Sequence, residues 1–326
     1  MLHKLFSRTL LTLFVATVYS CSNENVDVIR EYDETNTPYL TNHPLPKNAS
    51  TLRVLAIGNS YTIDGTAYLP EILDSLGIDA NCYGVYTLVA AGASLQYWDE
   101  VLQYHNPVKL IRRAGLLNVE VTSGSMVEIL SQPWDIIVFQ QVSYLSMSYD
   151  SFYPHLHHLI DAAKRYCTNE NVTLAWHMTH SYASTYIRGN GVPSVIRWQS
   201  IANATRMMMR FDGIDVIIPM GTAIENARHS TLQNDTELTR DGTHLAFGVS
   251  RYIAACAWVE TLFAPVFGFS VSNLTATHDL EEWEEFGIGV DAFIPGSSEA
   301  VTDNNRFLCI QCVNMASHHP YSIVNH

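Results

Sequence analysis

From Leu52 onward the sequence alternates short apolar runs with longer stretches in which apolar residues recur at helical spacing. Short apolar runs that end at glycine or at polar residues are typical of strands buried on both faces of a parallel sheet, and the stretches between them are typical of crossover helices. This alternation predicts an α/β fold, a three-layer sandwich around a five-stranded parallel sheet of flavodoxin-like order. The predicted strands lie near residues 54–57, 82–88, 134–139, 172–176 and 214–218.

Two segments depart from the regular alternation. Residues 105–131 contain two short β-like runs around turn residues, and we interpret them as an insertion near the site. The chain is irregular after Gly268 until a last helix near 301–317, which we expect to pack back on the same domain. The other predicted helices lie near residues 69–76, 152–163, 194–210 and 245–263.

The first 20 residues have the pattern of a secretory signal peptide. Lys4 and Arg8 precede an apolar run over 10–18, which is far shorter than the roughly 20 residues that a membrane-spanning helix needs. The sequence Val18-Tyr19-Ser20-Cys21 resembles a bacterial lipobox, in which the cysteine becomes lipidated. The alternative is an ordinary cleaved signal in which Cys21 has no role.

This reading divides the chain into three parts. Residues 1–20 form a lipoprotein-type signal peptide, residues 21–49 form a polar, proline-containing tether, and residues 50–326 form one domain that includes the last helix. We therefore expect an exported lipoprotein of the cell envelope, in the periplasm or at the outer membrane. Its contact with the membrane would run through the N-terminal lipid anchor only.

The charge and the cysteines exclude some classes of function. The formal net charge is −14, and so acidic a protein is a poor partner for nucleic acid, because like charges repel the phosphate backbone. Cys309 and Cys312 form a lone Cys-x-x-Cys pair in a helix-like run, whereas a zinc site needs about four ligands. We predict buried thiols and no metal site, and a disulfide elsewhere remains the alternative for an exported chain.

Ser60 lies where a parallel sheet places its chemistry. Gly58-Asn59-Ser60 follows the first strand, so we expect Gly58 to allow a sharp turn and Ser60 to begin a helix, with free backbone N–H groups beside its hydroxyl. A serine at this position can equally be an ordinary helix cap.

Asp241 and His244 precede the long apolar helix, across a turn that contains Gly242. A nucleophilic serine needs a base, and that base needs a carboxylate to orient it, which is a role that Asp241 can fill for His244. The alternative is a solvated turn whose aspartate caps the next helix.

Taken together, five ordered stretches of residues 52–264 resemble the SGNH/GDSL hydrolases, and within them the DUF4886 branch of bacterial lipoproteins. The resemblance implies the SGNH hydrolase fold, Ser60 as nucleophile, His244 as general base and then acid, and Asp241 as its orienting carboxylate. It also implies that the backbone N–H groups of Ser60 and Gly92 bind the oxyanion, and that no cofactor is needed. The stretches are Leu55–Ser60, Ala91–Leu95, Trp134–Ser143, Ile218–Ala223 and Arg240–Leu245.

The sequence departs from the SGNH pattern in two of these stretches. The first reads Gly-Asn-Ser where the family has Gly-Asp-Ser, and the substituted residue lies outside the triad. The third lacks the asparagine whose side chain completes the oxyanion hole. We expect Gln141 to take its place, or Gln140 if the alignment is shifted by one residue.

Further polar and aromatic residues follow the predicted strands. Asn59, Tyr61, Gln140 and His177 are candidates for the substrate pocket. His177 and His180 lie three residues apart without a nearby carboxylate, so we favour pocket lining or buried hydrogen bonding over a metal site.

The sequence thus predicts a serine esterase of acetylesterase type that hydrolyses small acyl esters, most plausibly acetyl groups on carbohydrates. Lipid esters and thioesters remain open as substrates, and the sequence carries no signal for an oligomeric state. The alternative is a glycan-binding surface lipoprotein on the same fold, with little turnover because the oxyanion asparagine is missing.

Overall fold

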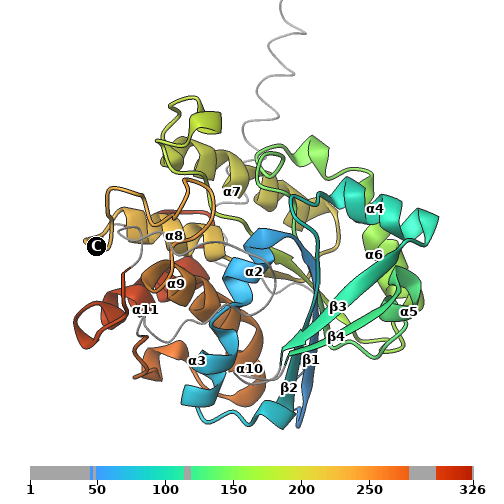
Figure 1. The fold of residues 1–326 in the computed structure, drawn as a ribbon. Coiled ribbons are helices and arrows are strands. Elements are labelled where there is room, and N and C mark those ends of the chain that lie inside the picture. Colours follow the sequence, from blue (N-terminus) through green and yellow to red (C-terminus); the bar gives the residue numbers. More distant parts are fainter. Residues whose placement is uncertain (1–44, 47–48, 114–118, 279–298, 325–326) are drawn as a thin grey trace, which may run out of the picture. The chain divides into compact units, whose positions relative to one another are not determined.

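The protein is built around one mixed sheet of seven strands in the order β4-β3-β2-β1-β5-β6-β7 (Figure 1). The computed structural model describes residues 45–46, 49–113, 119–278 and 299–324. Five neighbouring strands are parallel, and their order confirms the predicted flavodoxin-like topology. They are β1 (Leu52–Gly58), β2 (Tyr83–Val89), β5 (Ile136–Phe139), β6 (Thr173–His177) and β7 (Val216–Ile218).

The predicted insertion supplies the other two strands. β3 (Pro107–Arg113) pairs antiparallel with β2, and β4 (Val119–Ser125) pairs antiparallel with β3. The sequence predicted two short β-like runs here but not that they extend the main sheet. Pairing with β3 satisfies the backbone N–H and C=O groups that β2 would otherwise expose as an edge strand.

Helices cover both faces of the parallel strands, as expected for a three-layer sandwich. Alternate residues of β1 point to opposite faces, with Val54 and Ala56 in one hydrophobic core and Leu55 and Ile57 in the other. The first core lies under α3, α8, α9 and α11, and the second lies under α4, α5, α6 and α7 (Figure 1). The α-helices are α2 (Ser60–Thr66), α3 (Leu69–Ser75), α4 (Leu95–Tyr104), α5 (Met126–Leu130), α6 (His155–Tyr166), α7 (Ser194–Phe211), α8 (Met220–Arg228), α9 (Val249–Trp258), α10 (Ala264–Phe267) and α11 (Asp303–His318).

The long helix predicted from Leu245 begins four residues later, at Val249. Leu245 pairs with Thr239 in an isolated β-bridge, and Gly248 has a φ of 73°, so the chain cannot be helical before that point. After α9 a π-helical segment, Val259–Phe263, leads into α10.

Three histidines of α6 are hydrogen-bonded to two buried aspartates. His155 Nδ1 and His158 Nδ1 lie 2.8 Å and 2.9 Å from Asp99 Oδ2, and His157 is bonded to Asp212. Asp99 and Asp212 are both buried, so these bonds tie α6 to α4 and to the end of α7.

The predicted signal peptide, Cys21 and the tether up to residue 44 lie outside the described residues. Leu45, near the end of the predicted tether, is 5% exposed and belongs to the first core. Within the described ranges no helix is both long and apolar enough to cross a membrane.

Candidate active site

Ser60 is the first residue of α2, directly after β1. Asn59 caps this helix, and its Oδ1 accepts a hydrogen bond from Tyr61 N at 3.0 Å. A Cβ atom on Gly58 would lie 2.1 Å from Thr62 Oγ1 and 2.6 Å from Gln140 Oε1, and Gly58 does not have a positive φ. Glycine is therefore required here for close packing, and not for the sharp turn that the sequence suggested.

Asp241 and His244 lie in a tight turn, residues 240–245, which we call the His244 turn. Arg240 N donates to His244 O at 2.9 Å, and Asp241 Oδ1 accepts from Thr243 N at 2.9 Å and from His244 N at 2.7 Å. The turn thus uses one carboxylate oxygen of Asp241 to fix its own backbone and leaves the other for the imidazole ring.

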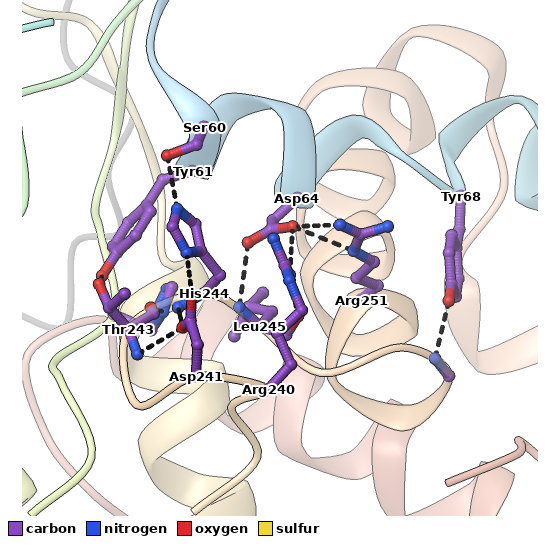
Figure 2. Close-up of polar contacts among 12 residues, drawn as sticks. Ser60, Tyr61, Asp64, Tyr68, Arg240, Asp241, Thr243, His244, Leu245 and Arg251 are labelled. Atoms are coloured by element: carbon purple, nitrogen blue, oxygen red, sulfur yellow. Dashed lines mark hydrogen bonds and ion pairs between the residues drawn. The ribbon is translucent and has the colours of Figure 1, made fainter. Parts of the chain in front are cut away.

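The three residues form a continuous chain of hydrogen bonds (Figure 2). His244 Nδ1 lies 2.6 Å from Asp241 Oδ2, and His244 Nε2 lies 2.9 Å from Ser60 Oγ. Burial raises the pKa of the Asp241 carboxyl, but hydrogen bonds from the side chain and backbone of His244 and from Thr243 N outweigh burial and hold the pKa well below its ordinary value. An ionised Asp241 accepts a hydrogen bond from Nδ1–H, and this tautomer leaves Nε2 free to accept the proton of Ser60.

The loop after β2 is hydrogen-bonded to Asn59, the residue that caps α2. Asn59 Nδ2 donates to Ala93 O at 3.0 Å, next to Gly92, whose φ of 65° lies in the left-handed region. Within the described part of the chain, no acceptor is bonded to the backbone N–H of Ser60 or of Gly92. Both N–H groups are therefore free to donate to a further acceptor.

The two glutamines after β5 are buried and already hydrogen-bonded. Gln141 Nε2 donates to Ser151 O at 3.0 Å, and Gln141 Oε1 accepts from Leu95 N and Val142 N. Gln140 Nε2 donates to Asn59 Oδ1 at 2.8 Å. Either glutamine would have to break these bonds to donate to a substrate, so the geometry does not favour them as oxyanion donors.

The residues expected in the substrate pocket lie beneath the site and not on its surface. Asn59, Tyr61, Gln140 and His177 are each 0–2% exposed. His177 Nε2 lies 3.0 Å from Met220 Sδ, and burial lowers the pKa of His177 to about 3, so the ring is neutral. Asn59, Tyr61 and Gln140 support the loops of the site, whereas His177 packs against Met220 of α8 and Trp258 of α9.

Tyr61 and His180 contact the buried side of the His244 turn through Thr243. The Tyr61 hydroxyl lies 2.8 Å from Thr243 Oγ1, its ring stacks on His180 with centroids 4.2 Å apart, and His180 Nε2 donates to Thr243 O at 2.7 Å. Burial lowers the pKa of His180 to about 3, which keeps it neutral.

Asp64 is a residue of the site that the sequence analysis missed. It lies on α2 one turn after Ser60, is 0% exposed, and binds Arg240, Arg251 and Leu245 N (Figure 2). The available signal was a single acidic residue four positions after Ser60 in a helix without other charges.

A hollow of about 360 Å³ lies beside the His244 turn, on the Asp241 side. Tyr186, Ile187, Asp235 and Thr236 contribute to its walls together with Asp241. Among the described residues, no three His, Cys, Asp or Glu side chains are grouped as a metal site would require.

The family model of a domain of unknown function, DUF4886, matches residues 53–273. This chain belongs to the DUF4886 family. The match covers the strands that carry the site, and it includes both Ser60 and the turn that holds Asp241 and His244.

Solved structures resemble the DUF4886 chain over most of its length. A DUF4886 family protein from Bacteroides uniformis ATCC 8492 is 25% identical, with a TM-score of 0.68 over 84% of this chain and 98% of that one. More distant matches include a mutant of an acetyl-xylooligosaccharide esterase from Geobacillus stearmophilus, 10% identical, with a TM-score of 0.45 over 67% of this chain and 96% of that one. Another is a GDSL-like lipase from Bacteroides thetaiotaomicron, 10% identical, with a TM-score of 0.38 over 65% and 86%. No curated protein matches the sequence significantly.

Proposed function

We propose that this DUF4886 protein is a serine esterase that removes small acyl groups, in particular acetyl groups, from carbohydrates. The observation that carries the proposal is the continuous chain from Ser60 Oγ through His244 to Asp241, with bonds of 2.9 Å and 2.6 Å. Serine nucleophiles in acyl transfer need this combination of base and orienting carboxylate, and the reaction requires no cofactor.

The chemistry follows from the positions of the atoms. Ser60 Oγ attacks the carbonyl carbon of the ester while its proton moves to His244 Nε2, and the backbone N–H groups of Ser60 and Gly92 stabilise the oxyanion. His244 then donates that proton to the leaving alcohol oxygen, which leaves Ser60 acylated. A water molecule, deprotonated by His244, attacks the acyl carbon, and His244 returns that proton to Ser60 Oγ as the acid leaves.

The hollow beside Asp241 is lined by neither Ser60 nor His244, so it can hold only a part of the substrate remote from the ester carbonyl. It combines the aromatic ring of Tyr186 with carboxylate and hydroxyl groups of Asp235 and Thr236, which together suit a ring with an apolar face and several hydroxyls. Lipid esters and thioesters are the competing substrates.

Hydrolysis of p-nitrophenyl acetate and butyrate by residues 22–326 tests the proposed reaction. Ser60→Ala should reduce kcat by at least about 10³-fold, because the acyl intermediate forms on Ser60 Oγ. Ser75→Ala, which removes only a hydroxyl bonded to Ile72 O at the end of α3, should retain full activity. Equal rates for wild type and Ser60→Ala would reject the esterase.

The alternative is a glycan-binding protein with little turnover. It is favoured by one observation, which is that the amides of Gln140 and Gln141 are engaged in internal bonds. Loss of one oxyanion donor typically lowers the rate by about 10²–10³-fold. Binding of acetylated glycans by wild type without turnover above Ser60→Ala would support this alternative.

We also propose that the protein is exported and anchored through a lipid on Cys21, with the membrane contacted only by that anchor. Metabolic labelling of the full chain with an alkyne palmitate in a bacterial host tests this. Label on wild type and none on Cys21→Ser is expected, whereas a soluble, unlabelled wild-type protein cleaved near residue 20 would indicate an ordinary signal peptide.

A further inference from the structure

A buried cluster of three charges lies directly beneath Ser60 and His244. Asp64 Oδ1 accepts hydrogen bonds from Arg251 Nη2 at 2.6 Å, from Arg251 Nε at 3.0 Å and from Arg240 Nη1 at 3.1 Å. The three residues are 0%, 6% and 5% exposed, and they come from α2, α9 and the His244 turn (Figure 2). No step of the proposed reaction uses them.

The cluster remains charged despite its burial. Burial raises the pKa of the Asp64 carboxyl, but the two guanidinium groups outweigh burial and hold the pKa below its ordinary value. A buried carboxylate with two arginines gives little net stability, because desolvation offsets most of the attraction. Its presence here therefore points to a role in specifying geometry.

Asp64 connects the two halves of the site. It follows Ser60 by one helical turn on α2, so the carboxylate and the nucleophile move with the same helix. Its Oδ2 accepts from Leu245 N at 3.0 Å, directly after His244, and its Oδ1 binds Arg240, directly before Asp241. Both ends of the His244 turn are thus fixed to the helix that carries Ser60.

This connection adds to the 2.8 Å contact between Tyr61 and Thr243, which also joins α2 to the His244 turn. The two residues are 184 positions apart in sequence, and the structure links them through one hydrogen bond of 2.9 Å. Arg251, on α9, donates a hydrogen bond to Asp64. Arg240 also donates to Leu245 O, which joins the first and last residues of the His244 turn. A shift of about 1 Å between reacting groups can lower a rate by about 10²-fold.

We propose that Asp64, held by Arg251, is a positioning residue that keeps His244 within hydrogen-bonding distance of Ser60 by binding both ends of the His244 turn. This inference rests on the proposed esterase function for its kinetic consequence. Its structural consequence, the Ser60 Oγ to His244 Nε2 distance, is independent of that function.

The first test is Asp64→Asn, which keeps the size of the side chain and removes its charge. We expect kcat for p-nitrophenyl acetate to fall about 10²-fold with KM changed by less than about 2-fold, because the turn and not the substrate site is displaced. Labelling of Ser60 by a serine-directed phosphonate should slow by a similar factor. The matched control is Asp215→Asn, a buried carboxylate that accepts from Leu174 N at the opposite end of the sheet, which should keep its kcat.

A second variant separates positioning from stability. Replacing the cluster by apolar residues, Asp64→Leu with Arg240→Met and Arg251→Met, removes all three charges together, so no buried charge is left without a counter-ion. The backbone N–H and C=O of Leu245 lose their partners in this variant, so we expect a cooperative thermal transition below that of wild type and a kcat as low as that of Asp64→Asn. A kcat near wild type in the apolar variant would overturn the proposal.

Crystal structures of both variants decide the matter even if no ester is hydrolysed. A Ser60 Oγ to His244 Nε2 separation beyond hydrogen-bonding distance in the variants supports positioning by Asp64, whatever reaction the site performs. An unchanged separation rejects it. If wild type hydrolyses esters no faster than Ser60→Ala, the proposed function is rejected. The role of Asp64 is then tested by the Ser60–His244 distance alone.

Discussion

At the scale of single residues, the buried tyrosine and histidines next to the site carry no charge, and this makes the stability of the fold depend on pH. Tyr61 and His180 hold Thr243 without carrying charge, since burial raises the pKa of Tyr61 and lowers that of His180. His177 is similar but has fewer bonds: its Nε2 contacts only Met220 Sδ, and its Nδ1 is without a partner among the described residues.

His177 should make the fold sensitive to mild acid. Its folded pKa of about 3 lies below its unfolded value of roughly 6.5, so the unfolded state binds a proton first and stability falls as the pH drops below about 6.5. Between pH 7 and pH 5 this one group should lower the free energy of unfolding by about 2 kcal/mol. In His177→Leu, which leaves no polar atom unpaired, that part of the pH dependence should be absent.

Urea unfolding of wild type and His177→Leu at both pH values measures this difference. The exposed Met207 on α7 provides the control, because Met207→Leu changes no titratable group and should leave the pH dependence of wild type unchanged. Parallel pH dependences in wild type and His177→Leu would contradict a buried neutral ring.

At the scale of elements, the position of α2 relative to β1 and β5 determines where Ser60 lies. Gly58 allows Thr62 and Gln140 to approach the end of β1, and Gln140 in turn binds the cap of α2 through Asn59. The first turn of α2 therefore lies closer to the sheet than any side chain at position 58 would permit.

Gly58→Ala should displace this turn. The added Cβ would lie 2.1 Å from Thr62 Oγ1, so we expect a loss of about 1–3 kcal/mol in unfolding free energy and a fall in kcat of about 10²-fold. Gly124→Ala in β4 is the matched control, because its Cβ would come no closer than 3.2 Å to Glu128 Oε2. Thermal unfolding and ester hydrolysis of the two variants check this, and wild-type activity in Gly58→Ala would show that the approach of Thr62 is not needed.

The elements also show what the sequence alone can predict. The five parallel strands were predictable because they are short runs dominated by apolar residues. Ser60, Asp241 and His244 were grouped through the resemblance of five ordered stretches to the SGNH hydrolases, since each residue alone could equally belong to a helix cap or a solvated turn. Asp64 was not, since its partner Arg251 lies 187 residues away and nothing local distinguishes a buried carboxylate from one on a solvated helix face. The hydrogen bonds of Gln141 could not be predicted for the same reason, because they depend on the positions of Leu95 and Ser151 in the folded chain.

At the scale of the whole molecule, the hydrophobic core extends beyond the part that defines the family. The family match ends at residue 273, yet α11 places Cys309, Ile310, Cys312, Val313 and Ala316 in the first core. Asn226 on α8 donates to Cys312 O at 3.2 Å and accepts from Val324 N at 3.1 Å. The last helix is thus a structural part of the layer that carries α8 and α9.

A charge in the buried face of α11 should therefore unfold the whole domain and not only its end. Val313 is 0% exposed, and Val313→Asp would bury an unpaired carboxylate, a change that costs several kcal/mol against a total stability of about 5–15 kcal/mol. Phe307 lies on the same helix but is 73% exposed, so Phe307→Asp should change the stability by less than about 0.5 kcal/mol. Circular dichroism melting of both variants, with ester hydrolysis as a second readout, compares the two faces of one helix. If Val313→Asp loses only the signal of α11 and keeps the activity of Ser60, the last helix is an independent appendage and the core ends where the family match does.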